Sequence, residues 1–483
     1  MASVNSRRIV SAVLTVAVTA TLLYFGTGLF PKWPLMWFAP LPILLFAPRS
    51  SWWATGLTAF LAWFLGALNL HHFFSALIHI PLAIQIVIYA TPALVFSLSV
   101  LLFRRLLRAG AYRTALVAFP AAYTTVEYLL TLASPHGTAG SLAYSQLNFL
   151  PFLQLASITG PSGMTFFLLL FSSGLAVAAY LSQSALKQAL RTAVASTAII
   201  GIILVFGVLR LSNPTSGPTV KVGLIATDLP EYEDVMGEGA ATQHLLQAYA
   251  SQAELLAAKG AQAIVIPEKI GVIAESRSGE ADRLLQILAD KTNVVIVVGL
   301  VDEAPPLSYN QARVYSPHLA TQTYDKHHML PPFESRFKPG TTLTTMDVPS
   351  GKWGVEICKD MDFTPLSRDY GRLGAGLMLV PAWDFVLDRF QHGHIAVMRG
   401  VEDGFSIARA ARDGYLTVSD NRGRILAETR SNSSSFATLL ADVPTTHDST
   451  IYLRFGDWFS WLTIAILAGT LVQLIRARQG ARA

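Results

Sequence analysis

Three polar residues of different chemical types follow predicted strands in the second half of the chain. Glu268 closes the apolar run AIVIPE, Lys326 stands in TYDKHHMLPPFE after a predicted hairpin, and Cys358 closes KWGVEIC. A cysteine attacks an acyl carbon well only when a base removes its proton, and the carboxylate of Glu268 is suited to that task. The resulting oxyanion needs a positive or hydrogen-bonding group, which Lys326 could supply, while Glu334 could orient the lysine.

Each of these residues also has an ordinary explanation. A lone cysteine is most often an inert buried side chain, and a Glu or Lys in a loop is most often a solvated charge. Cys358 is the chain's one cysteine, which excludes an internal disulfide and any multi-cysteine metal site. His327 and His328 adjoin Lys326, and FQHGH holds two more histidines, but none has an acid cluster nearby in the sequence, so no metal site is predicted. No phosphate-binding or dinucleotide-binding motif is visible, and no cofactor is expected.

The elements that must position these residues begin at Thr219. Short β-branched strands alternate with amphipathic segments predicted as helices over 240–259, 282–291, 364–373 and 390–403. This alternation predicts an α/β domain built on a central sheet, and functional groups of such domains gather on loops just beyond strand ends. The predicted strands are VKVGLIAT, AQAIVIPE, NVVIVVGLV, QARVYSP, KWGVEIC, AGLMLVPA, FSIARAA and GYLTVSD.

The rest of the chain has a membrane composition. Of its 483 residues, 52% are hydrophobic and 14% are charged, against about 25% charged in an ordinary soluble domain. This excludes a single soluble domain, a disordered chain and a small disulfide scaffold. Apolar runs of nearly bilayer length predict seven spans before the α/β domain and one after it, at 9–30, 33–47, 52–70, 81–103, 115–133, 160–181, 192–211 and 458–475. We therefore expect a membrane domain at 1–214, an α/β domain at 218–450 and a last membrane helix at 456–478.

The formal net charge of +5 is unevenly divided. Residues 1–217 and 451–483 together hold 15 Lys or Arg and two acids, whereas residues 218–450 hold 21 basic and 29 acidic residues. The positive-inside rule places the basic loops in the cytoplasm, and seven spans then put the α/β domain on the opposite face, which in a bacterium is the periplasm. The basic pI reflects these membrane-edge residues, so no nucleic-acid partner is expected. The basic loops contain Arg7, Arg8, Arg49, Arg104, Arg105, Arg108, Arg113, Lys187, Arg191, Arg476, Arg478 and Arg482.

Two features of the membrane part have two interpretations each. The stretch AYSQLNFLPFLQLASITGPSG is either an interfacial aromatic loop or a re-entrant wall that helps to hold a lipid. Glu127 is the one acid of the first membrane part. It is either functional, as intramembrane carboxylates often are, or lies near a helix end from which its charge reaches the interface.

In chain order, Glu268 in IVIPEK, Lys326 in YDKHHMLPPFE and Cys358 in GVEICKDMDF resemble the Glu–Lys–Cys triad of the nitrilase, or carbon–nitrogen hydrolase, superfamily. The segment MRGVEDGFSIARAARDGYLTVSDNRGRI resembles the part of those proteins after the cysteine. With membrane spans on both sides, nearly the whole chain resembles the bacterial apolipoprotein N-acyltransferase family, including FLAWFLGAL and YSQLNFLPFLQLASITGPSG.

This resemblance implies a polytopic α-helical membrane domain of about eight spans and an α/β nitrilase-like αββα sandwich. It implies a ping-pong acyltransferase of the bacterial inner membrane, a monomer without cofactor or metal. Cys358 would take an acyl chain from a phospholipid as a thioester. The acceptor would be the N-terminal amine of diacylglyceryl-cysteine in an apolipoprotein.

The resemblance also implies roles for individual residues. Glu268 would be the general base, Lys326 would stabilise the oxyanion and Glu334 would support the pair. Substrate-binding positions would be Asn310, Trp383 and Asp360.

The sequence departs from the family pattern at several positions. Lys269 follows the triad glutamate, Lys359 and Asp360 follow the cysteine, and LPPFESRFKPG lacks the glycine before its Glu. These changes leave the residues of the chemical steps in place, but the resemblance then does not fix which acyl donor and acceptor are recognised. The alternatives are a membrane-anchored carbon–nitrogen hydrolase, an amidase or nitrilase acting on another amide or amine, and a non-catalytic membrane scaffold.

Overall fold

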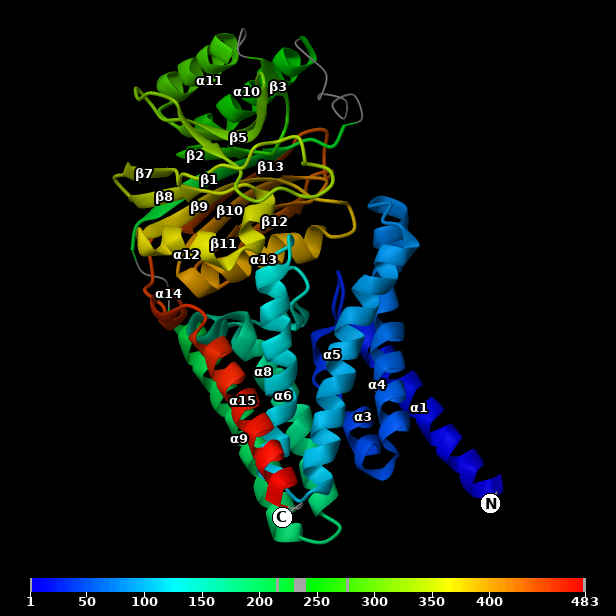
Figure 1. The fold of residues 1–483 in the computed structure, drawn as a ribbon. Helices are drawn as coiled ribbons and strands as arrows, with labels where there is room; N and C mark the ends of the chain where they lie inside the picture. The colour runs from blue at the N-terminus through cyan, green and yellow to red at the C-terminus, as the bar shows by residue number, and fades with distance from the viewer. Residues whose placement is uncertain (1, 214–216, 230–239, 275–277, 481–483) are drawn as a thin grey trace. The chain divides into compact units, whose positions relative to one another are not determined.

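The computed structural model describes residues 2–213, 217–229, 240–274 and 278–480, and the chain divides into two compact units (Figure 1). The helical unit comprises Met1–Ala133, Gly140–Arg210 and Phe455–Ala483, and the α/β unit comprises Ser134–Ala139 and Leu211–Arg454. The segment Ser134–Ala139, which the sequence leaves inside the membrane part, thus belongs to the α/β unit.

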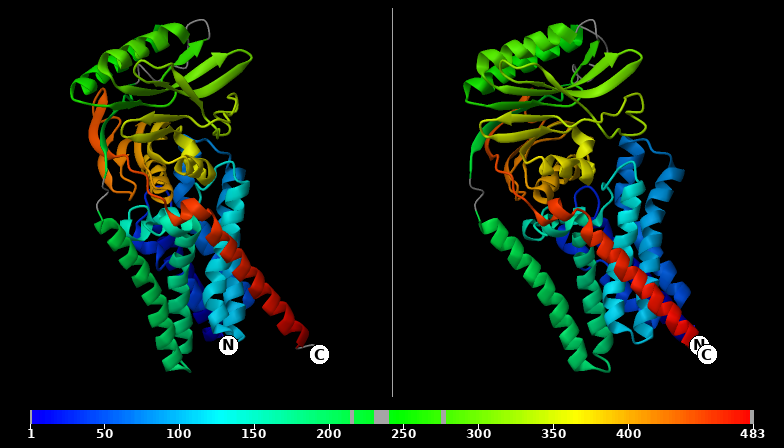
Figure 2. Two further views of the ribbon diagram at one scale, coloured as in Figure 1. Left: turned by 90° about the vertical axis from the view of Figure 1, so that its left-hand side faces the viewer. Right: turned by 60° about the vertical axis from the view of Figure 1, so that its left-hand side comes forward.

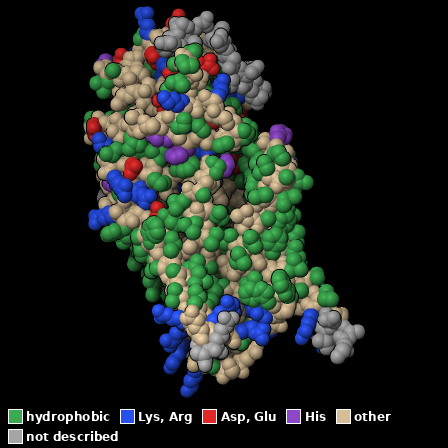
Figure 3. Space-filling model, in the orientation of Figure 1, with side chains coloured by type: hydrophobic (Ala, Val, Ile, Leu, Met, Phe, Trp, Pro, Cys, Tyr) green, Lys and Arg blue, Asp and Glu red, His purple; other side chains and the backbone are tan. Residues whose placement is uncertain are grey.

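In the described part of the chain, seven helices are long and apolar enough to cross a membrane. A helix suits such segments because it satisfies its own backbone polar groups where no water is present. The visible flank of the helical unit is mostly hydrophobic, and Lys and Arg gather at one end (Figure 3). The seven are α1 (Ala2–Gly26), α4 (Trp52–Gly66) continued by η2 to Leu70, α5 (Leu82–Arg108), α6 (Tyr112–Ala133), α8 (Ala156–Leu181), α9 (Leu186–Ser212) and α15 (Trp458–Gly480).

The second expected span, 33–47, is not one continuous helix. Prolines interrupt it, because proline lacks the amide that would continue a helical ladder. The segment still runs from one end of the unit to the other. Asn69, just beyond α4, donates to the Tyr24 carbonyl near the end of α1 (2.9 Å), whereas Arg104, near the far end of α5, donates to the carbonyls of Ala47 and Ser50. The crossing is built from α2 (Trp33–Met36), α3 (Leu41–Phe46) and η1 (Ala47–Arg49).

The aromatic stretch after Ala139 is buried within the helical unit. Gln146 accepts a hydrogen bond from the Trp37 indole (2.9 Å), and Phe149 stacks on Trp33 with ring centroids 3.9 Å apart. Glu127 holds this aromatic stretch in place by accepting hydrogen bonds from Ser141, Thr165 and the amide of Leu142. The short elements that join the spans are η2 (Ala67–Leu70), η3 (Phe73–Leu77), η4 (Leu142–Gln146) and α7 (Leu150–Leu153).

The α/β unit contains two sheets. The strands are β1 (Thr219–Ala226), β2 (Ala263–Ile266), β3 (Val272–Ala274), β4 (Val295–Ala304), β5 (Leu307–Tyr315), β6 (Gln322–Asp325), β7 (Thr345–Val348), β8 (Gly351–Val355), β9 (Ala375–Trp383), β10 (Ser406–Arg412), β11 (Tyr415–Ser419), β12 (Ile425–Arg430) and β13 (Ala437–Pro444). The helices are α10 (Ala240–Ala258), α11 (Ser278–Thr292), η7 (Cys358–Asp362), α12 (Thr364–Arg372), α13 (Arg389–Asp403) and α14 (Ile451–Phe455).

The two sheets pack face to face between helix layers. The larger has the order β13-β1-β2-β4-β5-β6 with β3 paired to β4, and the smaller has the order β12-β11-β10-β9-β8-β7. Successive residues of a strand point to opposite faces, so Val222 and Leu224 of β1 join the core between the sheets, whereas Ile225 packs with α10 and α11. Helices α12 and α13 cover the outer face of the smaller sheet (Figures 1 and 2). The predicted αββα sandwich is confirmed.

Candidate active site

The ends of parallel strands bring the predicted site residues together. Strands β1, β2 and β4 are parallel, as are β8, β9 and β10, so the carboxyl ends in each sheet emerge at one edge. Glu268 follows β2, and its amide donates to the Ala382 carbonyl of β9 (3.2 Å), which joins the edges of the two sheets. Cys358 follows β8 and Lys326 follows β6.

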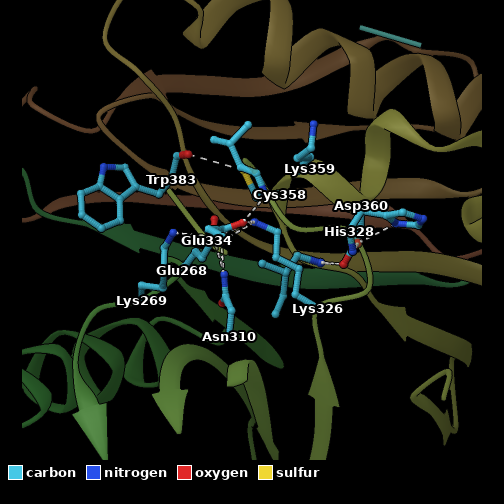
Figure 4. Close-up of polar contacts among 12 residues, drawn as sticks. Glu268, Lys269, Asn310, Lys326, His328, Glu334, Cys358, Lys359, Asp360 and Trp383 are labelled. Atoms are coloured by element: carbon cyan, nitrogen blue, oxygen red, sulfur yellow. Dashed lines mark hydrogen bonds and ion pairs between the residues drawn. The ribbon is translucent and has the colours of Figure 1, made fainter. Parts of the chain in front are cut away.

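Two carboxylates and a lysine form a buried cluster at this edge (Figure 4). Nζ of Lys326 lies 2.8 Å from Glu268 Oε1 and 2.8 Å from Glu334 Oε2. Asn310 donates from Nδ2 to both carboxylates, at 2.5 Å and 2.9 Å. All four side chains are at most 2% exposed, so the pairs are little screened by water.

Neighbouring opposite charges keep Lys326 and Glu334 ionised. Burial alone would lower the pKa of Lys326, but Glu268 and Glu334 outweigh that effect and raise it well above 10.5. Burial would raise the pKa of Glu334, but the charges of Lys326 and Lys269 bring it below its ordinary value. Lys326 is therefore a fixed cation at neutral pH, as an oxyanion partner must be.

The thiol of Cys358 is held at the same edge in a strained backbone. Its φ is 45°, a left-handed value that costs energy for a residue with a Cβ and is often found at functional sites. Burial, followed by the negative charge of Glu268, raises the pKa of the thiol to about 12. The group is therefore protonated at rest, and a reaction at its sulfur would need a base. Among the described residues, both side-chain hydrogen bonds to Glu268 reach Oε1, which leaves Oε2 as the oxygen that could accept a proton.

The side chain of Asp360 is directed at neighbouring groups of the protein. It is fully buried, and its oxygens accept hydrogen bonds from the Tyr324 hydroxyl (2.7 Å) and the His328 amide (2.8 Å). It thereby fastens the loop after Lys326 to the turn of Cys358. The carboxylate for which the sequence predicts substrate binding is thus hydrogen-bonded to the protein itself. Asn310 likewise bridges carboxylates.

Trp383 borders the site through both its backbone and its ring. Its carbonyl accepts a hydrogen bond from Cys358 Sγ (3.4 Å), and its indole donates to Asp413 (2.8 Å). Nζ of Lys269 lies 5.4 Å from the ring centroid and 2.6 Å from Glu334 Oε1. The departure at Lys269 thus adds a second cation to the cluster, while Lys359 points away from it (Figure 4).

The sequence missed a second charged group near the thiol. A ring nitrogen of His392, a carboxylate oxygen of Asp384 and Cys358 Sγ lie within 4.8 Å of one another. Arg409 donates to both oxygens of Asp384. The expectation that the histidines of FQHGH have no acids nearby is therefore wrong for His392. The signal that could have found them is the polar residue directly after β9 and the Asp388–His392 spacing of one helical turn.

An αββα sandwich with a buried carboxylate, lysine and thiol at its strand ends is the architecture expected of a carbon–nitrogen hydrolase. The family model for carbon–nitrogen hydrolase matches residues 229–447, and the model for the apolipoprotein N-acyltransferase N-terminal domain matches residues 15–174. The chain belongs to the apolipoprotein N-acyltransferase family, the membrane branch of that superfamily.

Apolipoprotein N-acyltransferases of two bacteria are similar to this chain over most of its length. The apolipoprotein N-acyltransferase of Geobacter metallireducens is 25% identical over 89% of this chain and 89% of its own. That of Haemophilus ducreyi is 26% identical over 70% of this chain and 71% of its own. Among solved structures, an amidase of the nitrilase superfamily from Nesterenkonia AN1 is 21% identical, covers 50% of this chain and 95% of its own, and has a TM-score of 0.42.

Proposed function

We propose that this protein transfers an acyl chain from a membrane phospholipid to the N-terminal amine of a diacylglyceryl-cysteine apolipoprotein. The main observation behind the proposal is that a single chain contains both a buried thiol–carboxylate–lysine site and a helical membrane unit. An amidase with a soluble substrate has no need of membrane helices. A lipid donor and a lipid-bearing acceptor both require them.

In the first half-reaction, Glu268 takes the proton of Cys358 while the sulfur attacks the ester carbon of the phospholipid. Lys326 stabilises the oxyanion that forms. When the intermediate collapses, the ester C–O bond breaks, and Glu268 returns the proton to the departing oxygen. The products are a thioester on Cys358 and a lysophospholipid.

In the second half-reaction, the amine of the acceptor attacks the thioester. Glu268 takes a proton from the amine, the C–S bond breaks, and the proton returns to the sulfur as the amide leaves. Water competes with the amine for the same thioester, so the site must limit access of water. Cys358 is only 5% exposed, which suits that requirement.

Apolar side chains next to the site fit a lipid substrate. Phe333 adjoins Glu334 and is 49% exposed, with its ring centroid 5.8 Å from that of Phe385. Val386 is 48% exposed on the loop that follows Trp383. Exposed apolar groups on the two loops that carry site residues are expected where an acyl chain enters.

Basic loops alternate with loops that carry little charge, and this alternation supports one orientation of the protein in the membrane. Seven crossings before the α/β unit, with the basic loops in the cytoplasm, put that unit on the opposite face. We assign the protein to the bacterial inner membrane with its catalytic unit in the periplasm, acting as a monomer.

Mass spectrometry of a lipoprotein N-terminus, in cells with and without this protein, tests the function. We expect a triacylated N-terminus only when the protein is present, and transfer of a labelled acyl chain from phospholipid to lipoprotein. If the label is instead released as free fatty acid or found on another amine, while lipoproteins stay diacylated, the alternative hydrolase function replaces the proposal.

Gly299 offers a test of how closely Glu268 must be placed. A Cβ at Gly299 on β4 would lie 2.5 Å from the Cα of Glu268, a distance that forces the backbone to move. We expect Gly299→Ala to reduce the rate of acyl transfer about 100-fold, because a shift of about 1 Å in a catalytic group has effects of that size. The control is Gly279→Ala, where a Cβ meets nothing within 4 Å. Equal rates for the two variants would contradict the expectation.

A further inference from the structure

His392 lies beside the nucleophile within a ring of acids. Its Nδ1 is 3.4 Å from Asp384 and 3.5 Å from Asp388, and its Nε2 is 3.4 Å from Asp362. One of its ring nitrogens lies within 4.8 Å of Cys358 Sγ. The three carboxylates come from the end of β9, the residue before α13, and η7, so three parts of the fold converge on one imidazole.

The surroundings favour the charged form of this imidazole. Burial alone would lower the pKa of His392, but Asp362, Asp384 and Asp388 outweigh it and raise the pKa well above 6.5. A positive charge this close to sulfur favours thiolate over thiol. Other charged groups act on the same cluster. Arg409 pairs with Asp384, Lys359 lies 4.0 Å from Asp362, and Arg399 also acts on Asp362. The charges of Glu268 and Lys326 act on the thiol in opposite directions.

We propose that His392 is a positioning residue that stabilises the developing thiolate of Cys358 while Glu268 removes its proton. The inference rests on the proposed function in one respect, namely that Cys358 is the nucleophile. The two groups divide the task. The S–H bond breaks and the proton passes to Glu268, whereas the imidazolium keeps its own proton and offsets the negative charge left on sulfur.

Alkylation of the full-length protein by iodoacetamide tests this directly, because Cys358 is the only cysteine. We expect His392→Gln to slow alkylation at pH 8 about tenfold or more and to move the alkylation-versus-pH curve to higher pH. The reason is that unit charges about 5 Å apart interact by more than one pK unit at the effective dielectric of a protein. Glu268→Gln should move the curve to lower pH, since that carboxylate disfavours the thiolate.

His394→Gln is the matched control. His394 lies on the same helix and is buried, but its ring stacks on Phe390 with centroids 4.1 Å apart. We expect its alkylation curve to match the wild type. His392→Lys keeps a positive charge and should retain most of the wild-type midpoint, an outcome that loss of packing alone does not predict.

An unchanged curve for a folded His392→Gln variant would overturn the inference, as would equal shifts in the Gln and Lys variants. If His392→Gln does not accumulate, His392→Asn takes its place with the same expected shift. Failure of the proposed function has a different signature: lipoproteins remain diacylated with the wild-type protein, whatever the alkylation curves show.

Discussion

Replacing Cys358 with alanine is expected to abolish acyl transfer, with the rate reduced at least about 10³-fold. The thiol is the one group in the described site able to form an acyl-enzyme, and its removal leaves Glu268 and Lys326 with no atom to activate. The measurement is twofold. Labelled phospholipid is incubated with the purified protein to trap a labelled thioester, and the lipoprotein N-terminus is then analysed by mass spectrometry.

The partner variant for this experiment is Glu268→Gln, which keeps the hydrogen-bonding shape but cannot take the thiol proton. We expect it to retain the thiol, as alkylation would show, yet to form little thioester. If Cys358→Ala reaches normal membrane levels and still yields triacylated lipoprotein, the site has been assigned wrongly. That result would favour a non-catalytic scaffold.

The fold was largely predictable from the sequence because buried apolar residues recur with the period of a strand or a helix. Alternating β-branched strands and amphipathic helices predicted the α/β sandwich, and apolar runs predicted the spans. The second span differs, since hydropathy alone does not reveal that prolines divide 33–47 into α2 and α3. The segment Ser134–Ala139 also differs. Thr138 donates from both its amide and its hydroxyl to the Asp362 carbonyl, a contact 224 residues distant in sequence that no local pattern encodes.

The site was predictable in part, because its polar side chains stand directly after strands. Glu268, Lys326 and Cys358 each stand there, and the structure brings Glu268, Lys326 and Glu334 into direct contact. The orientation of a side chain was not predictable. Asp360 directs its carboxylate to Tyr324 and to backbone amides, and this depends on how two loops meet in three dimensions. His392 was missed for the same reason, because its acids lie on separate elements.

Replacing Lys326 with methionine is expected to remove activity and to destabilise the α/β unit. Among the described residues, the change leaves Lys269 as the ammonium that pairs with the buried carboxylates of Glu268 and Glu334. Loss of one partner from a buried ion pair costs about 3–5 kcal/mol. For a domain of this size, that corresponds to a Tm lower by about 10 °C. Thermal unfolding in detergent and the acyl-transfer assay together measure the two effects.

The double variant Lys326→Met/Glu334→Gln separates stability from catalysis. Removing one of the two carboxylates relieves their repulsion, so we expect most of the lost Tm to return while the rate stays low, because no cation faces the oxyanion. Recovery of both would show that Lys326 only balances charge.

The pH dependence of stability supplies an independent check on the same cluster. The pKa of Glu334 is lowered on folding, so its contribution is present above its unfolded value and is lost as the pH falls. The pKa of Lys326 is raised, so its contribution is full below 10.5 and is lost as the pH rises through the folded value. The wild type should therefore lose Tm at both extremes. In Lys326→Met, the fall of Tm at alkaline pH should disappear. If Tm falls at alkaline pH as much as in the wild type, the stabilising charge lies on another residue.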